Sequence, residues 1–179
     1  MSDGLLTRVK LSRLVYLAIA ALIFIADQAT KAMVEKFIPE RGVITVIPRL
    51  FNLIHVQNGG AAFGLFSDSP APWKEDLLIA VSAALLAMIA TIVWRSRRIT
   101  RASGVGLALI LGGALSNLVD RIRFGQVVDF LDFYVKDYHW YTFNLADSAI
   151  VVGAGLLILQ VLKNEADPQK SEVRSQKSE

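Results

Sequence analysis

Two stretches of this sequence run for 18 residues without a charged side chain: LLIAVSAALLAMIATIVW at residues 77–94 and ASGVGLALILGGALSNLV at residues 102–119. A helix that crosses a bilayer needs about 20 predominantly apolar residues. Both stretches have this length and character. They therefore predict two membrane-spanning helices joined by a short basic link.

Two shorter apolar stretches lie on either side of this pair. Residues 14–26 carry no charge before Asp27, and residues 148–162 carry none after Asp147. The four spans predicted are residues 13–34, 77–95, 102–120 and 145–163. Asp27 and Asp147 fit such spans only at a membrane boundary or facing the protein interior, and an ionisable residue at that depth indicates a functional site.

Residues 1–26 also have the pattern of a signal peptide. Arg8, Lys10 and Arg13 form a basic region, and an apolar region follows them. We favour a membrane span, because the hydrophobic segment continues past the only plausible cleavage region and three more spans follow.

The composition agrees with a membrane protein. Of the 179 residues, 54% are hydrophobic and 20% are charged, and the mean hydropathy is +0.46. Soluble domains rarely contain so much apolar material, and disordered chains contain far less. The chain has no cysteine, which excludes a disulfide scaffold, a thiolate zinc site and a cysteine nucleophile. Its net charge of +3 is too balanced for a protein that binds nucleic acid.

The distribution of basic residues predicts the orientation in the membrane, because cytoplasmic loops carry an excess of Lys and Arg. Eleven of the 19 basic residues lie on one side of the predicted spans: Arg8, Lys10, Arg13, Arg95, Arg97, Arg98, Arg101, Lys163, Lys170, Arg174 and Lys177. Both termini should therefore face the cytoplasm. Residues 1–165 are expected to form a single membrane-embedded domain, and residues 166–179 a disordered cytoplasmic tail.

Two longer segments, residues 35–76 and 121–143, fall on the opposite side. In the first, residues 43–47 and 50–56 are rich in β-branched or aromatic residues and are bounded by proline or glycine, which predicts strands. The predicted fold class is a mainly α membrane protein. It has four transmembrane helices, a small extracytoplasmic β-sheet and a second extracytoplasmic segment.

Polar residues gather near the outer ends of the predicted spans. They form the clusters Asp27-Gln28-Ala29-Thr30-Lys31, Asn58-Gly59-Gly60-Ala61-Ala62-Phe63-Gly64, Gly112-Gly113-Ala114-Leu115-Ser116-Asn117-Leu118-Val119-Asp120-Arg121, Val128-Asp129-Phe130 and Phe143-Asn144-Leu145-Ala146-Asp147-Ser148. Local spacing predicts an i,i+4 ion pair between Asp27 and Lys31, with Lys31 extending to the interface. It also predicts a helix N-cap at Asn144, with Asp147 as an acidic residue in the first turn.

The cluster at the end of the third span combines small and polar residues. Gly112 and Gly113 allow close helix packing. Asn117, Asp120 and Arg121 share a helix face and should point at one another or at a polar cavity, because lipid does not accept them. Asp120 is expected to form a structural ion pair with its neighbour Arg121. The glycines after Asn58 indicate either a simple turn or a close backbone approach to a substrate.

Several kinds of hydrolytic site lack their ligands or motifs. His55 and His139 are the only histidines and no H-E-x-x-H motif occurs, so we expect no metal and no other cofactor. No G-x-S-x-G motif supports a Ser-His-Asp set. A Ser-Lys dyad, for example Ser148 with Lys31, stays open, although no motif supports it.

Two carboxylates that share one proton can hydrolyse an amide without metal or nucleophile. The ionised carboxylate deprotonates a water, and the protonated one polarises the scissile carbonyl. Asp129 and Asp147 offer two carboxylates at the same membrane depth. The spacing alone does not place them side by side.

Five motifs, in the order D-Q-x-T-K, N-x-G-A-A-F, G-G-A-x-x-N-x-x-D-R, V-D-F and F-N-x-A-D, resemble those of the bacterial lipoprotein signal peptidases (signal peptidase II) over roughly residues 13–162. The resemblance implies a four-helix aspartic endopeptidase of the bacterial inner membrane, with its active site near the extracytoplasmic face. It implies that the enzyme cuts diacylglyceryl-modified prolipoproteins just before the lipid-bearing cysteine. Membrane lipid is then a second partner, and globomycin an inhibitor.

The same resemblance implies a set of site residues. Asp129 of V-D-F and Asp147 of F-N-x-A-D would be the catalytic pair. The residues that bind substrate or support the pair would be Asn58, Asn117, Arg121 and Asn144, and the structural residues Asp27, Lys31 and Asp120. The third motif usually has glycine where this chain has Ser116, and we expect this small residue to preserve the helix packing.

Two other classes of protein fit part of the pattern. A small proton-coupled transporter or channel subunit would use Asp27, Asp120 and Asp147 as a relay. It predicts acidic residues near mid-membrane and some repeat symmetry, whereas here the acids cluster at one face and the two halves of the chain do not resemble each other. A structural membrane scaffold would leave the buried Asn and Asp residues unexplained.

Overall fold

The computed structural model describes residues 2–60, 73–95 and 100–165. Its helices are α1 (Ser2–Phe37), α2 (Trp73–Arg95), α3 (Arg101–Phe124) and α4 (Leu145–Glu165). Each contains a segment that is long and apolar enough to cross a membrane: Arg13–Phe37, Trp73–Arg95, Arg101–Phe124 and Leu145–Lys163. The four long apolar helices that the sequence predicts are therefore present. The predicted cytoplasmic tail lies outside the described residues.

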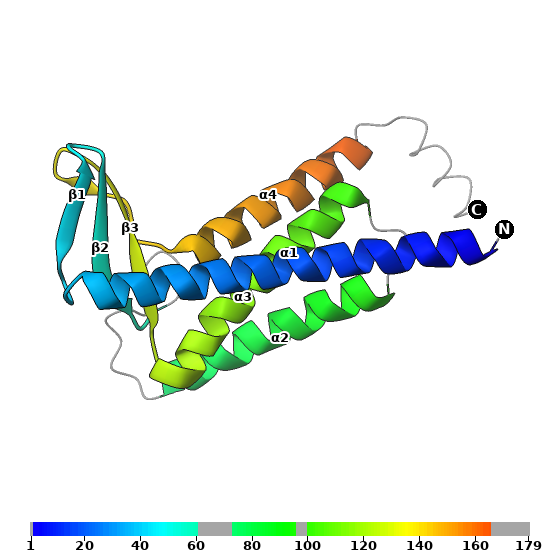
Figure 1. Cartoon of the computed structure of the whole chain (residues 1–179), viewed down its shortest axis with the longest axis horizontal. Helices are drawn as coiled ribbons and strands as arrows, with labels where there is room; N and C mark the ends of the chain where they lie inside the picture. The colour runs from blue at the N-terminus through cyan, green and yellow to red at the C-terminus, as the bar shows by residue number, and fades with distance from the viewer. Residues whose placement is uncertain (1, 61–72, 96–99, 166–179) are drawn as a thin grey trace.

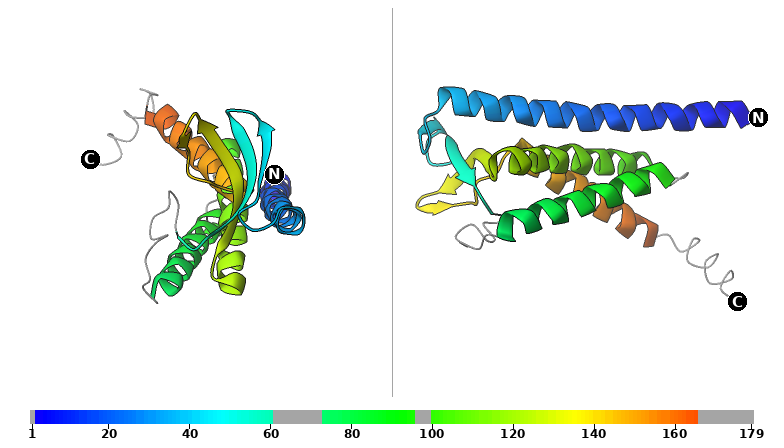
Figure 2. Two further views of the ribbon diagram at one scale, coloured as in Figure 1. Left: turned by 90° about the vertical axis from the view of Figure 1, so that its left-hand side faces the viewer. Right: turned by 90° about the horizontal axis from the view of Figure 1, so that it is seen from below.

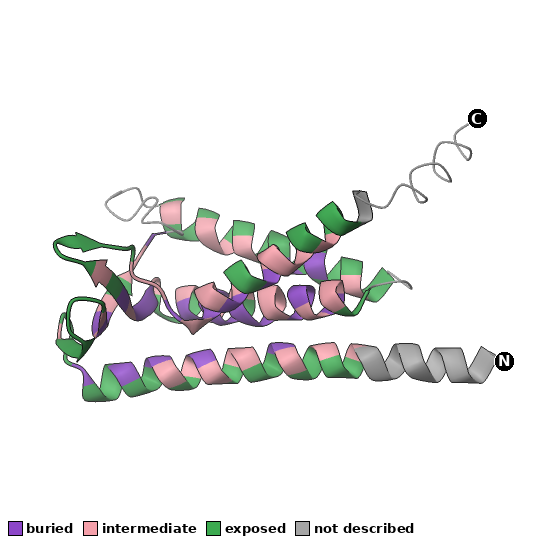
Figure 3. Ribbon diagram, turned by 90° about the horizontal axis from the view of Figure 1, so that it is seen from above, coloured by how far each residue is buried: buried purple, intermediate pink, exposed green. Residues whose placement is uncertain are grey.

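Helix α3 is the centre of the bundle and packs against each of the other three helices, whereas α2 packs mainly on α3. Half of the residues in the most apolar 18-residue stretch of α3 are buried, compared with 11% in the corresponding stretch of α2. Buried residues accordingly gather on α3 and on the sheet-proximal half of α1 (Figure 3). The other three helices expose many large apolar side chains, such as Leu22, Leu85 and Val151, as expected for surfaces that face lipid.

Two glycines bring α3 into close contact with its neighbours. A Cβ on Gly112 would lie 2.4 Å from the carbonyl oxygen of Ala20 in α1, and a Cβ on Gly113 would lie 2.4 Å from that of Ala146 in α4. No side chain fits at such distances, so these positions require glycine. The predicted close packing at these two glycines is confirmed, and it brings the first turn of α4 against α3.

Four antiparallel strands form a sheet in the order β1 (Val43–Ile47), β2 (Phe51–Asn58), β3 (Val127–Val135) and β4 (Tyr138–His139). The sheet lies at one end of the helical bundle, opposite the start of α1 and the end of α4 (Figures 1 and 2). β1 and most of β2 match the strands predicted from sequence. β3 forms from the segment for which no strand was predicted.

The sheet is anchored on the end of α1. Val128 and Phe130 of β3 pack in one buried cluster with Val34 and Ile38. In β2, Val56 is paired with Asp129 of β3. This pairing fixes Asp129 on a strand directly above the helices, which is how the sheet contributes to the candidate site.

Candidate active site

Asn144 joins the two carboxylates that were predicted to form a catalytic pair. Its side-chain Nδ2 donates a hydrogen bond to Asp129 Oδ1 over 2.8 Å. Its Oδ1 accepts one from the backbone N–H of Asp147 over 2.9 Å, and its own backbone N–H donates to Asp147 Oδ2 over 3.4 Å. Because Asn144 is completely buried, one fixed side chain holds both the strand carboxylate and the helix carboxylate.

Asp147 lies in the first turn of α4, where the exposed N–H groups of the helix favour a negative charge. The bonds between Asn144 and Asp147 form the N-cap that was predicted from their spacing. Asp147 Oδ1 also accepts a hydrogen bond from Asn117 Nδ2 over 2.8 Å. Asp147 is thus both a helix-capping residue and a neighbour of Asp129.

Asp129 is almost completely enclosed, with 1% of its surface exposed. Asn58 Nδ2 donates to its Oδ2 over 2.8 Å, which complements the bond from Asn144 to Oδ1. Burial raises the pKa of Asp129 to about 7, and the negative charge of Asp147 acts in the same direction. A carboxyl group with this pKa retains its proton in a large fraction of molecules at neutral pH.

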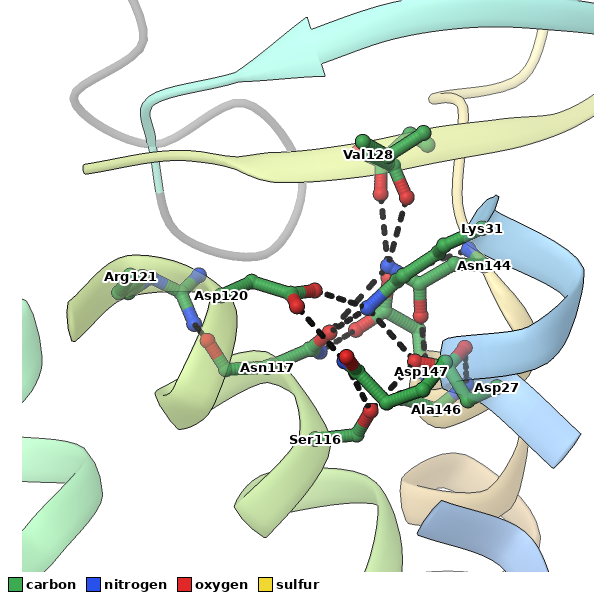
Figure 4. A network of polar contacts seen from close by, with 12 residues as sticks. Asp27, Lys31, Ser116, Asn117, Asp120, Arg121, Val128, Asn144, Ala146 and Asp147 are labelled. Carbon is green, nitrogen blue, oxygen red and sulfur yellow. Dashed lines mark hydrogen bonds and ion pairs between the residues drawn. The ribbon is translucent and has the colours of Figure 1, made fainter. Parts of the chain in front are cut away.

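Lys31 connects α1 to the polar residues of α3 (Figure 4). Its Nζ lies 2.6 Å from Asp27 Oδ2 and 2.5 Å from Asp120 Oδ2, and it donates to Asn117 Oδ1 over 2.8 Å. With 4% of its side chain exposed, Lys31 does not extend to the interface, and that prediction was wrong. The carboxylate that α3 supplies allows the ammonium group to be buried.

The ion pair of Asp120 also differs from the expected one. Asp120 pairs with Lys31 and accepts a hydrogen bond from Gln28 Nε2 over 2.6 Å. The expected partner, Arg121, follows Asp120 in the chain, and it points elsewhere. Asp120 is buried at the contact between α3 and α1, so its partners come from α1.

Asp27 ties three helices together. It is completely buried, its Oδ1 accepts the backbone N–H of Ala146 in α4 over 2.8 Å, and its Oδ2 accepts the hydroxyl of Ser116 in α3 over 2.7 Å. The role expected for Asp27 was limited to the first span. The contacts show that Asp27 also holds the start of α4, where Ala146 precedes Asp147.

Arg121 holds the backbone that follows Asn58. Its Nη2 donates to the carbonyl oxygen of Gly60 over 3.1 Å, and Asn58 Oδ1 accepts the N–H of Gly60 over 2.8 Å. Arg121 Nη1 also lies 3.4 Å from the carbonyl oxygen of Asn117. The rest of the N-x-G-A-A-F motif, from Ala61 onward, lies outside the described residues.

The nine residues singled out from sequence therefore form one continuous polar network. They are Asp27, Lys31, Asn58, Asn117, Asp120, Arg121, Asp129, Asn144 and Asp147. In the described part of the chain, no group of three or more His, Cys, Asp or Glu side chains could hold a metal ion.

The alternative Ser-Lys dyad gains no support from the contacts of its two members. The hydroxyl of Ser148 donates to the carbonyl oxygen of Asn144, the N-cap of its own helix, over 3.0 Å. Lys31 is paired with two carboxylates. None of these contacts joins Ser148 to Lys31.

Two further residues that bond to this network, Gln28 and Ser116, were given no polar role from sequence. Gln28 lies inside the D-Q-x-T-K motif, and its Nε2 donates to both Ser116 Oγ and Asp120 Oδ1. Ser116 was considered only for its size, yet its hydroxyl is completely buried and bonded on both sides. The sequence signal that could have identified Gln28 was its place in the D-Q-x-T-K motif. The signal for Ser116 was that this position usually has glycine in the family.

Comparisons with known proteins show which proteins this chain resembles. The family described as signal peptidase (SPase) II matches residues 19–163. The chain is 48% identical over 145 residues to a lipoprotein signal peptidase of Solibacter usitatus, covering 81% of this chain and 88% of the relative. It is 44% identical over 153 residues to one of Desulforapulum autotrophicum, covering 85% and 94%.

The fold is similar to that of a bacterial membrane enzyme solved by the in meso method at 2.3 Å resolution. The TM-score is 0.78 at 28% sequence identity, and the match covers 86% of this chain and 91% of the other. The family match begins within α1 and ends within α4, and it includes α2, α3, the sheet and every residue of the polar network. The chain therefore belongs to the signal peptidase II family.

Proposed function

We propose that Asp129 and Asp147 are the catalytic pair with which this signal peptidase II removes the signal peptides of prolipoproteins. The observation that carries the proposal is the buried Asn144, which binds both carboxylates through its side chain and its backbone. The substrate class follows from the family and from its relatives, which are lipoprotein signal peptidases.

The surroundings of the two carboxylates assign them different charges. Asp147 is the ionised member, because it lies at the N-terminus of α4 and accepts a bond from Asn117, whose own oxygen is held by the Lys31 ammonium. Asp129 is the protonated member, because its pKa is raised to about 7. The negative charge of Asp147 also favours the protonated form of Asp129.

The reaction then uses one water and returns both carboxyl groups to their starting states. The oxygen of the water bonds to the scissile carbonyl carbon while Asp147 takes a proton from that water. At the same time, Asp129 gives its proton to the carbonyl oxygen. The tetrahedral intermediate collapses by breaking the C–N bond. The proton held by Asp147 passes to the leaving amine, and a hydroxyl proton of the intermediate returns to Asp129 as the new carboxyl group forms.

Four polar residues hold the substrate or the pair in this proposal. Asn117 and Asn144 orient the two carboxylates through the bonds described above. Asn58 accepts a hydrogen bond from the N–H of Gly60, and Arg121 donates one to its carbonyl oxygen. These bonds fix the backbone that follows Asn58, whose side chain also bonds Asp129.

The proposed orientation places the pair at the outer surface of the bacterial inner membrane. Arg95, Arg101 and Lys163 lie at the helix ends opposite the sheet, and such basic ends favour the cytoplasm. Both termini are then cytoplasmic. A diacylglyceryl-modified cysteine stays in the bilayer, so the bond just before it reaches the pair at the interface, and globomycin would block this site.

A cleavage assay with purified protein tests this function. A diacylated prolipoprotein should lose a fragment of signal-peptide size, and Asp129→Asn should abolish the cleavage. The matched control is Asp132→Asn on the same strand, because Asp132 is equally buried but bonds Asn52 and His139 instead of Asn144. Equal loss in both variants would contradict the assignment.

The dependence on lipid is tested with the same protein. We expect the precursor that lacks the diacylglyceryl group to be cut far more slowly in detergent, because the pair lies at the membrane surface. Equal cleavage of both precursors would refute recognition of the lipid. The transporter alternative has no finding in its favour, since the family and its relatives are peptidases.

A further inference from the structure

The first turn of α4 depends on a contact from another helix. The N–H groups in the first turn of a helix have no partner within that helix. Asn144 satisfies the N–H of Asp147, and Asp27 from α1 satisfies the N–H of Ala146 over 2.8 Å. Asp27 thus acts as a second cap for α4, one residue before the carboxylate that we assign as the base.

The carboxylate of Asp27 is itself oriented by Ser116. Its Oδ2 receives the Ser116 hydroxyl over 2.7 Å and the Lys31 ammonium at 2.6 Å, which leaves Oδ1 directed at Ala146. Both Asp27 and Ser116 are completely buried. Water therefore does not compete for these bonds.

The direction of the Ser116 hydroxyl is determined by its two partners. A carboxylate only accepts hydrogen bonds, so the hydroxyl donates to Asp27. Gln28 Nε2 donates to Ser116 Oγ over 2.9 Å and to Asp120 Oδ1 over 2.6 Å. Because Asp120 also only accepts, the NH₂ group of Gln28 must face both oxygens, and every bond in this part of the network has one possible direction.

We infer that Ser116 is a positioning residue of the active site, whose hydroxyl orients Asp27 and so fixes the first turn of α4 that carries Asp147. The inference rests on the proposed function of Asp147 as the catalytic base. It assigns Ser116 a polar role in addition to the small size expected from sequence. Gln28 supports it as the donor to the same hydroxyl.

The test separates the hydroxyl from the volume of the side chain. Ser116→Ala keeps most of the volume but removes the donor, and it leaves no room for a water. Ser116→Gly opens a space beside a buried carboxylate and a carboxamide, the kind of polar site that holds an ordered water. If the hydroxyl matters, the glycine variant should be more active than the alanine variant; if only volume matters, the order should be reversed.

We expect Ser116→Ala to lower kcat for diacylated prolipoprotein by about tenfold through displacement of Asp147, with KM nearly unchanged. Ser116→Gly should lie between this variant and the unmodified protein. Ser103→Ala is the matched control, because Ser103 is on the same helix and its hydroxyl bonds Thr100 at the far end. It should leave kcat and KM unchanged.

Two results would overturn the inference: an unchanged kcat for Ser116→Ala, or a Ser116→Gly variant no more active than Ser116→Ala. Asp147→Asn is measured in the same series. If Asp147→Asn stays active, the proposed function has failed. If it is inactive while Ser116→Ala has an unchanged kcat, only the role of Ser116 has failed.

Discussion

Asn144 holds Asp129 by a 2.8 Å hydrogen bond while it caps the helix that carries Asp147. The strand carboxylate and the helix carboxylate therefore do not have independent positions. Any change at Asn144 acts on the helix start and on the pair together. The two effects can be separated because a shorter side chain can still cap the helix.

Asn144→Ser should keep the protein folded and still remove most of its activity. Serine is as good an N-cap as asparagine, but it is too short to reach Asp129 Oδ1. Asn144→Ala should lose activity and, in addition, about 1 kcal/mol of stability through the lost cap. Thermal unfolding in detergent and cleavage rates measure the two effects, and an Asn144→Ser enzyme with full activity would contradict the bridging role.

The raised pKa of Asp129 predicts how stability depends on pH. Its pKa rises from 3.8 to about 7 on folding, so the native state binds this proton more tightly than the unfolded state does. The free energy of unfolding should therefore fall as the pH rises from 3.8 to about 7. Asp129→Asn cannot titrate and lacks this contribution.

The difference in Tm between the unmodified protein and Asp129→Asn measures this effect. The unmodified protein should lose Tm relative to the variant between about pH 4 and pH 7, the interval over which the proton is released. A difference that does not change with pH, or that changes in the opposite direction, would show that Asp129 has no raised pKa.

Lys31→Met should destabilise the fold far more than the same change on the outside of the helix. The change leaves Asp27 and Asp120 buried without their shared cation, and breaking a buried pair in this way costs about 3–5 kcal/mol. Lys36→Met is the control, because Lys36 lies on the exposed side of α1. Equal yields of folded protein from the two variants would be incompatible with a buried Lys31.

The orientation can be measured with single cysteines, because the chain has none of its own. Cysteines at Ser2, Ser96 and Ser175 should resist an impermeant thiol reagent in intact cells once the outer membrane is permeabilised. A cysteine at Thr45, which is exposed on β1, should react. Labelling of Ser96→Cys from outside would reverse the proposed topology.

The sequence predicts well whatever depends on local periodicity. The spans follow from runs of apolar residues, the cap at Asn144 follows from its spacing to Asp147, and the packing glycines follow from their place in α3. The residues of the site were found through the family resemblance, because each motif lies in a different segment. Their mutual contacts follow from the packing of those segments.

The features that depend on contacts between distant segments were either missed or predicted wrongly. Lys31 has Asp27 one turn away, but the second carboxylate that allows its burial comes from Asp120 on α3. The run Val127–Val135 does not show a clear alternation, because most of its residues are buried on both faces. It is a strand since β2, which lies far earlier in the chain, provides its pairing edge. Local spacing carries no information about such partners.

The central claim is that Asp129 and Asp147 act as a unit, and a double-mutant cycle on kcat measures this most directly. Asp129→Asn and Asp147→Asn keep the shape of each side chain but remove its capacity to exchange a proton. Each should lower kcat for a diacylated prolipoprotein by orders of magnitude, and the double variant should be scarcely slower than either single one, because the members of a catalytic unit are strongly non-additive. A folded Asp147→Asn protein that cleaves at a comparable rate, or a double variant in which the two losses multiply, would contradict the account.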